Sequence, residues 1–346
     1  MSEKIILAIE TSCDETAAAV YCGTNELSSI VNSQIEIHGQ FGGVVPEIAS
    51  RNHLMMLPHV VKQALLKANL VFQDLECIAC TFGAGLQGAL LTGLSYAKAL
   101  AYSLNIPLIP INHIQAHIAT NFLSVLPPFL CLVVSGGHTS IVEVLDFDKF
   151  SVLSSTADDA MGECFDKVAR VLNLGYPGGP SIEKAGQGHK ANINFFKNAR
   201  TKNSVLSFSG LKTASVNYIR QRQSDGKLSE QQVGNICASF SKAAIEIVVS
   251  NTFKYAKQKS YKSIALAGGV AANKDLQASL IEQATQQGMI VHCPQLKYCT
   301  DNAAMVALCC HFQNAHNYMT VNNPSYLNLN VESNLSIETM YKHCKN

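Results

Sequence analysis

The sequence predicts an α/β protein made of two like-folded lobes that face each other across a central cleft. The chain has 346 residues, more than one hydrophobic core usually covers. A unit of apolar strand, polar turn and second strand occurs twice, at residues 5–21 and 129–144, and forms an internal repeat. A strand, a glycine turn and an amphipathic helix follow one another at residues 78–104, as is typical of α/β lobes.

The first half of the chain is expected to form one lobe. Its first hairpin is followed by a loop and by a helix that begins at Pro46 and continues to about Lys67, with Pro58 as a candidate kink. The other expected elements of this half are strands at 78–82 and 106–111 and helices at 89–104 and 113–123.

The second half is expected to form the other lobe, after a boundary near residues 124–128. We therefore predict domains at 1–125 and 126–346, the second with a basic helical insertion at about 186–230. Thr300 and Asp301 are expected to cap the last helix. The other expected elements are helices at 158–170, 231–257, 274–287 and up to about 311, and strands at 263–267 and 289–293.

Composition limits the classes of function. Hydrophobic residues make up 47% and charged residues 15%, which is typical of a folded globular chain. A net charge of +1 argues against a general polyanion binder, although a local basic face could hold RNA. The twelve cysteines are scattered, and no leader or membrane-spanning run is visible. We expect a cytoplasmic protein with reduced thiols and no membrane partner.

A histidine pair and a distant carboxylate form a candidate metal site. His113 and His117 are one turn apart on a predicted helix, so both imidazoles leave the same face. Together with Asp301 they could hold a transition metal with open positions. The alternative is two polar residues on a half-exposed helix, because eleven histidines make this spacing common by chance.

Four glycine pairs follow or join the predicted strands and could bring backbone N–H groups close to an anion. Each pair could equally serve turn conformation alone. Asn273, after the last pair, could cap a helix or bind a sugar or base. No pair matches GxGxxG or a Walker loop, which disfavours dinucleotide enzymes and P-loop NTPases. The pairs are Gly83/Gly85, Gly136/Gly137, Gly178/Gly179 and Gly268/Gly269.

Two further segments leave alternatives open. Asp166 could accept hydrogen bonds from a ribose or pair with Arg170. Residues 206–213 could hold a phosphate or cap the next helix, and the basic run around them could bind RNA phosphates or form a solvated face. The run contains Lys190, Lys197, Arg200, Lys202, Lys212, Arg220, Arg222 and Lys227.

Eight motifs, in collinear order between residue 5 and about 308, resemble the bacterial TsaD family. This family comprises tRNA N6-adenosine threonylcarbamoyltransferases with the two-lobed fold of actin, Hsp70 and sugar kinases (ASKHA). The motifs are IETSCDET (9–16), NHIQAH (112–117), VSGGHT (134–139), GECFDK (162–167), YPGGP (176–180), FSGLKT (208–213), AGGVAAN (267–273) and CTDNAAM (299–305).

The resemblance implies an activity and the molecules that take part in it. The threonylcarbamoyl group of L-threonylcarbamoyl-adenylate would move to N6 of adenosine 37 in tRNAs reading codons that begin with A. This reaction forms t6A and releases AMP. The implied partners are tRNA, the adenylate, a smaller paralogous subunit and an ATPase subunit.

The resemblance also assigns site residues. One divalent metal ion, iron or else zinc, would bind His113, His117 and Asp301. The family's Gly-Pro-Gly-Leu-Val-Gly loop has Ala84 and Gln87 here, and the tail lacks the usual Pro-Arg-Trp ending, so loop rigidity and partner contacts could differ. The implied nucleotide and substrate contacts are Val133, Val134, Ser135, Gly136, Gly137, Asp166, Gly179, Glu183 and Asn273.

No residue stands out as a general base, and Glu10 and Asp14 in the first turn are the candidates. Two alternatives to the transferase are a non-catalytic nucleotide-binding partner subunit and a small-molecule kinase or carbamoyltransferase of the same fold. The intact histidine pair and Asp301 argue against the scaffold. Ile114 follows His113, so a His-Glu-x-x-His metalloprotease motif is absent from the sequence.

Overall fold

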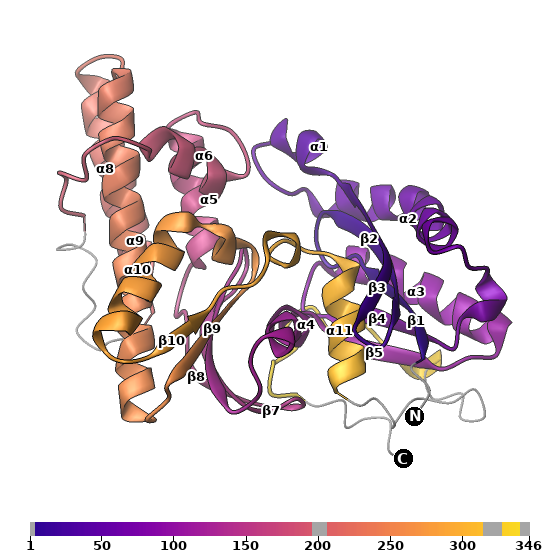
Figure 1. Cartoon of the computed structure of the whole chain (residues 1–346). Coiled ribbons are helices and arrows are strands. Elements are labelled where there is room, and N and C mark those ends of the chain that lie inside the picture. The colour runs from indigo at the N-terminus through magenta and orange to yellow at the C-terminus, as the bar shows by residue number, and fades with distance from the viewer. Residues whose placement is uncertain (1–3, 196–205, 314–326, 340–346) are drawn as a thin grey trace.

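A computed structural model describes residues 4–195, 206–313 and 327–339, and it contains two five-stranded sheets with the same topology (Figure 1). The strand orders are β3-β2-β1-β4-β5 and β8-β7-β6-β9-β10. In each sheet an antiparallel three-stranded meander joins two parallel strands. The predicted α/β fold with two like-folded lobes is therefore confirmed.

The first sheet is built from the N-terminal hairpin and two crossover strands. The hairpin strands pair in register from Ile5 opposite Cys22 to Glu10 opposite Ala17, so the polar turn between them leaves the same end of the sheet as Glu10. The edge strand β3 is partly exposed, and the other four strands are almost wholly buried. The strands are β1 (Ile5–Glu10), β2 (Glu15–Cys22), β3 (Asn25–Ser33), β4 (Cys77–Gly83) and β5 (Leu108–Asn112).

The second sheet repeats this plan with the second hairpin. Phe129 lies opposite Val144 and Val134 opposite Thr139, which places the turn at residues 135–138 at the matching end of the sheet. The two polar turns of the sequence repeat therefore reach equivalent positions in the two lobes. The strands are β6 (Phe129–Val134), β7 (Thr139–Asp146), β8 (Lys149–Ser155), β9 (Ser263–Ala267) and β10 (Ile290–His292).

Two short helices lie between the sheets. The helices α4 (His113–Ala119) and α11 (Ala303–Phe312) contact each other and share one core with strands of both sheets (Figure 1). α11 follows the second lobe in sequence but packs on β1 and β2 of the first. The domain limits at 125 and 126 stay a prediction.

The remaining helices cover the outer faces of the lobes. α2 runs through Pro58 without interruption and ends at Asn69 in the left-handed conformation, a common helix stop. The helices of the first lobe are α1 (Ile35–Gly39), α2 (Pro46–Ala68) and α3 (Gln87–Leu104). Those of the second are α5 (Met161–Val171), α6 (Gly178–Gly186), α8 (Ser209–Ser224), α9 (Glu230–Gln258) and α10 (Lys274–Gln286).

Within the described residues, α9 is long and apolar enough to cross a membrane, which the sequence reading did not anticipate. However, 67% of its most apolar window is buried inside the structure. Phe240 and Phe253 on this helix are fully or almost fully buried in the core of the second lobe. A core helix of a folded domain has this pattern.

The described C-terminal residues form a strap (residues 327–339) behind α4. The Lys98 ammonium group on α3 donates to the carbonyl of Leu327, and Glu332 pairs with Gly83 at the end of β4. Farther along, Gln115 donates to the carbonyl of Ile337, and the Glu338 carboxylate accepts the N–H of Val152 in the second lobe. The strap therefore connects the first lobe, the helix α4 and the second lobe.

Candidate active site between the lobes

The predicted metal ligands meet at the junction of the two lobes. Asp301 Oδ1 lies 3.0 Å from His117 Nε2 and 3.6 Å from His113 Nε2. Each of the three residues offers one ligand atom, and these three atoms all lie within 4.8 Å of one another. The Asn112 side chain caps α4 by accepting the N–H groups of Ile114 and Gln115, which fixes the helix that carries both imidazoles. Residues 184 positions apart in sequence are thus brought together.

Asp301 can face the histidines because another residue caps α11. Asn302, in extended conformation, accepts the N–H of Met305 at 2.9 Å and is the N-cap. The expectation that Thr300 and Asp301 perform this role is wrong. The cap satisfies the helix end one residue later, so the Asp301 carboxylate is left for the cluster.

Glu10 lies behind His113, on the side away from Asp301. Its Oε2 is 3.2 Å from His113 Nδ1 and accepts the hydroxyl of Thr81, while its Oε1 accepts the N–H of Ser12. Burial opposes ionisation of Glu10, but the positive charge and hydrogen bond of His113 outweigh it and lower the pKa of the carboxyl. Glu10 is fully buried and is not part of the cavity wall. A carboxylate behind a metal-binding histidine is a common arrangement that orients the ring.

The residues of this cluster fit a metal ion by distance and by donor chemistry. Two ligand atoms held at about 2.0–2.1 Å from one ion in tetrahedral geometry lie about 3.3 Å apart, close to the 3.0 and 3.6 Å that separate Asp301 Oδ1 from the two imidazole Nε2 atoms. His117 Nδ1 is buried without a hydrogen-bond partner among the described residues, so Nε2 is the nitrogen of that ring directed at the cluster. Burial would lower the pKa of His113, but Asp301 and Glu10 raise it to about 9, which shows a strongly cation-attracting environment.

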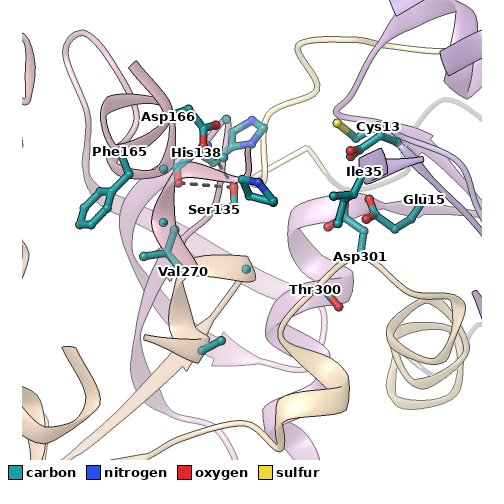
Figure 2. Close-up of a pocket in the computed structure, with 18 of the residues that line it drawn as sticks. Cys13, Glu15, Ile35, Ser135, His138, Phe165, Asp166, Val270, Thr300 and Asp301 are labelled. Atoms are coloured by element: carbon teal, nitrogen blue, oxygen red, sulfur yellow. Dashed lines mark hydrogen bonds between the residues drawn. The ribbon is translucent and has the colours of Figure 1, made fainter. Parts of the chain in front are cut away.

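A cavity of about 400 Å³ opens beside this cluster and is lined by both lobes (Figure 2). Cys13, Glu15 and Asp301 lie on one side of the view, and Ser135, His138 and Asp166 lie on the other. The predicted contact residues that line the cavity are Ser135, Gly136, Gly137, Asp166, Gly179, Glu183 and Asn273. Val133 and Val134 do not line it, since both are fully buried within β6.

The glycines around the cavity serve two different purposes. A Cβ on Gly136, Gly137 or Gly179 would meet no atom within 4 Å, so these backbones face open space and can approach a ligand. A Cβ on Gly268, by contrast, would lie 2.4 Å from the carbonyl oxygen of Val134, and its φ of +94° also requires glycine. Gly268 therefore allows close backbone packing.

Asp166, Glu183 and Asn273 form the polar wall of the second lobe. Asp166 accepts the N–H of Gly178 at 2.7 Å, and Asn273 both caps α10 and donates to Glu183 at 3.2 Å. Burial raises the pKa of Asp166 more than the Gly178 N–H and the Arg170 charge lower it. Asn273 therefore fills its structural role and still lies at the cavity.

The acidic turn between β1 and β2 forms the wall of the first lobe. Asp14 and Glu15 both line the cavity. Burial, with the nearby charges of Asp301 and Asp14, raises the pKa of Glu15 to about 10, so this carboxyl is neutral at pH 7. Asp14 Oδ2 is buried and has no hydrogen-bond partner among the described residues. This turn thus places one proton-bearing carboxyl next to one with a free oxygen.

Several cavity residues were not singled out from the sequence. Burial and the histidine cluster lower the pKa of His138 to about 4, so this ring is neutral near the candidate metal site. His138 directly follows Gly136 and Gly137, and Glu15 follows Asp14, so adjacency to chosen residues was the available signal. The cavity residues missed in this way are Ser12, Cys13, Glu15, His138, Gly162, Phe165, Tyr176 and Thr300.

The segment at residues 206–213 contains the start of α8, but none of its own side chains caps the helix; Asp158 accepts the hydrogen bonds there instead. The Asp158 carboxylate accepts the N–H groups of Phe208 and Ser209 and the hydroxyl of Ser209, at the first turn of α8. α5 therefore begins at Met161, not at Asp158 as predicted. Lys212 is paired with Asp159.

The basic run divides into paired and free members. Lys212 faces α5, whereas the other described members are exposed: Lys190, Arg220, Arg222 and Lys227. Lys197, Arg200 and Lys202 lie outside the described residues. The part of the run open to a polyanion is therefore found at residue 190 and toward the end of α8.

The fold and the cavity define the class of protein: a two-lobed α/β protein with a ligand cavity and a candidate metal centre where the lobes meet. Two solved structures share the fold. T. kodakarensis HypF superposes with a TM-score of 0.61 at 13% identity, covering 93% of this chain and 49% of that one. Component A of (R)-2-hydroxyglutaryl-CoA dehydratase from Acidaminococcus fermentans gives a TM-score of 0.52 at 12% identity, covering 90% and 98%.

Sequence comparison identifies the family. Residues 25–308 match the family TsaD, tRNA N6-adenosine threonylcarbamoyltransferase. The tRNA N6-adenosine threonylcarbamoyltransferase of Clostridium perfringens (strain SM101) is 48% identical over 343 residues, which cover 97% of this chain and 99% of the relative. The chain belongs to the TsaD family and is a tRNA-modifying transferase that forms t6A. The family expected from the motifs is thereby confirmed.

Proposed function

We propose that the chain transfers the threonylcarbamoyl group from L-threonylcarbamoyl-adenylate to N6 of adenosine 37 in tRNAs reading codons that begin with A, and that it does so in the interlobe cavity. In this step the N6 amine forms the new N–C bond. The bond between the carbamoyl carbon and the phosphate oxygen breaks, AMP leaves, and one amine proton is released. The observation that supports this site most directly is the convergence of His113, His117 and Asp301, of which His113 and Asp301 line the cavity.

His113 and His117 through Nε2, together with Asp301, would hold one divalent metal ion, iron or zinc. When bound, the ion would act as a Lewis acid toward a carbonyl or phosphate oxygen of the donor. Glu10 accepts from His113 Nδ1 and so keeps Nε2 directed at Asp301. We therefore assign Glu10 to orientation of His113, since it is fully buried and separated from the cavity.

The acidic turn supplies the groups for proton transfer. Asp14 remains our candidate for the base that takes the amine proton, because it lines the cavity. Glu15 is unsuited to this role, because a carboxyl with a pKa of about 10 already holds its proton at neutral pH. The O–H of the Glu15 carboxyl can instead donate a hydrogen bond to an anionic group of the adenylate.

The opposite wall would bind the adenylate. The open backbone at Gly136 and Gly137 can approach the phosphate, and the carboxylates of Asp166 and Glu183 can accept hydrogen bonds from ribose hydroxyls. Asn273 keeps its position because it caps α10 while its amide reaches Glu183. Val133 and Val134 would contribute only through the strand that carries the 135–138 turn.

The partners are the finer part of the proposal. We place the tRNA across the cavity mouth, with the exposed Arg220, Arg222 and Lys227 as candidate phosphate contacts. By family resemblance, a smaller paralogous subunit and an ATPase subunit would act with the chain. A cytoplasmic location is proposed because tRNA is the substrate.

Replacement of His113 by Ala tests the metal and the chemistry together. Purified protein, its partner subunits, tRNA and L-threonylcarbamoyl-adenylate are combined, t6A is measured by nucleoside mass spectrometry, and bound metal by elemental analysis. We expect loss of most of the metal and a decrease in t6A formation of at least about 100-fold. His59→Ala, an exposed histidine on α2, should match the wild type. Full activity in a metal-free His113→Ala protein would refute the metal role.

A further inference from the structure

His53 on α2 lies directly beneath the acidic turn. Its side chain is fully buried, and it is not part of the cavity wall. Nε2 is 2.9 Å from the carbonyl oxygen of Cys13, and Nδ1 is 2.8 Å from the hydroxyl of Thr16. These two contacts fall on either side of Asp14 and Glu15, so one ring holds both ends of the segment that carries the two carboxyls.

The partners determine the tautomer of His53. A carbonyl oxygen can only accept, so the proton must be on Nε2, and Nδ1 then accepts the Thr16 hydroxyl. Burial lowers the pKa of His53 more than the Cys13 carbonyl and nearby acids raise it, which keeps the ring neutral. A neutral ring that donates from Nε2 and accepts at Nδ1 matches its two shortest contacts, the Cys13 carbonyl and the Thr16 hydroxyl.

The rest of the turn is held from the same side. The N–H of Gln34 donates to the Asp14 carbonyl at 3.0 Å, and the Ser33 hydroxyl donates to Glu15 at 3.1 Å. The Gln34 amide reaches His53 Nδ1 at 3.4 Å and the Ala49 carbonyl at 3.4 Å. Of the side chains that contact the turn here, those of Ser33 and Gln34 lie outside α2, whereas His53 belongs to it. His53 therefore ties the turn to a 23-residue helix.

We propose that His53 is a positioning residue for threonylcarbamoyl transfer: it fixes the backbone of the acidic turn so that the Asp14 and Glu15 carboxyls face the reacting groups. The inference rests on the proposed function of this cavity. His53 touches neither substrate nor metal ligand, and it acts through the Cys13 carbonyl and the Thr16 hydroxyl. Without the ring, two buried polar groups lose their partner and the turn can relax away from its observed position.

Two His53 variants and one control test this role. His53→Ala removes both contacts, whereas His53→Gln keeps an N–H near the position of Nε2 and can still donate to the Cys13 carbonyl. His59→Ala changes an exposed histidine on the same helix. Each variant is assayed, with partner subunits, for kcat and KM of t6A formation, bound metal and thermal melting. The modification rate of the Cys13 thiol by a maleimide is followed by peptide mass spectrometry, with the part-buried Cys293 as internal reference.

We expect His53→Ala to lower kcat by about 10–100-fold, because misplacement of catalytic groups by about 1 Å has effects of this size. The KM for tRNA and the metal content should change by less than about twofold, since the tRNA and metal contacts are untouched. Cys13 labelling should rise several-fold relative to Cys293, and His53→Gln should restore most of both kcat and Cys13 protection. His59→Ala should behave as the wild type.

An unchanged kcat in folded His53→Ala, or a lost kcat with unchanged Cys13 labelling and no rescue by Gln, would overturn the proposal. Should His53→Ala fail to fold, His53→Gln and its labelling pattern decide, with wild-type protection of Cys13 and near-native kcat as the supporting result. Failure of the proposed function would appear differently. In that case His113→Ala keeps its activity, while the Cys13 labelling still reports whether His53 holds the turn.

Discussion

Asn112 allows a quantitative test of how α4, the helix that carries His113 and His117, is held. Its side chain is 4% exposed and has two separable functions. Oδ1 caps α4 by accepting the N–H groups of Ile114 and Gln115 at 2.9 and 3.3 Å, and Nδ2 donates to the Ser336 carbonyl of the strap at 3.0 Å. Loss of an N-cap costs about 1 kcal/mol, and loss of the hydrogen bond to the carbonyl of Ser336, an exposed residue, costs about 0.5–1.5 kcal/mol.

Asn112→Ala should therefore lower the free energy of unfolding by about 1.5–2.5 kcal/mol. Asn112→Ser retains a capping oxygen but cannot reach Ser336, so it should lose only the second contribution, about 0.5–1.5 kcal/mol. Guanidinium unfolding of both variants and the wild type measures the difference, and hydrogen exchange at Gln115 and Ile337 separates the cap from the strap. Equal stability of the two variants would refute the capping contribution, and wild-type stability of both would refute the whole argument.

Two further predictions concern the stability of the lobes. Hydrogen bonds from the first turn of α8 outweigh the effect of burial and hold the pKa of Asp158 below its ordinary value of 3.8, so its stabilisation is present above pH 3.8 and is lost as the pH falls further. Asp158→Asn should lower the free energy of unfolding by about 1 kcal/mol at pH 7. Urea titrations should show that this difference between wild type and variant narrows only below about pH 4. A difference that widens in acid would contradict the assignment. Gly83→Ala places a Cβ 2.3 Å from the Glu332 carbonyl oxygen, so calorimetry should show a loss of about 1–3 kcal/mol in the free energy of unfolding. Gly39→Ala is the control, because a Cβ there meets no atom within 4 Å and the change should be near neutral. Equal melting temperatures of the two variants would disprove the close approach.

The strap gives a physical meaning to two departures from the family pattern. Gly83 and Gly85, on either side of Ala84 in its loop, both contact the strap. Gly83 pairs with Glu332, and the N–H of Gly85 donates to the Ser333 carbonyl. Ala84 itself is buried at 1% exposure, so it fits the packed space without a proline. The rigidity of this loop therefore comes from tertiary contacts as well as from its own residues.

Local sequence patterns were sufficient for most of the secondary structure and for two of the three residues of the candidate metal site. Alternating and continuous apolar runs located the strands of both hairpins, and proline, glycine and asparagine marked several helix ends. The four-residue spacing of His113 and His117 placed both rings on one helix face, because helix periodicity is a local property. The collinear motifs then identified the family and suggested Asp301 as the third ligand.

Only the tertiary structure decided which groups meet and in what protonation state. Glu10 and Asp14 are both acids of the same turn region, yet one lies behind His113 and the other lines the cavity, a difference set by packing on β4 and α4. Nothing in the sequence distinguishes Glu15 from other acids, but burial and the charges of Asp301 and Asp14 raise its pKa to about 10. Ligand geometry and desolvation depend on residues far apart in the chain, whereas helix and strand periodicity depends on neighbours, and this is the physical reason for the division.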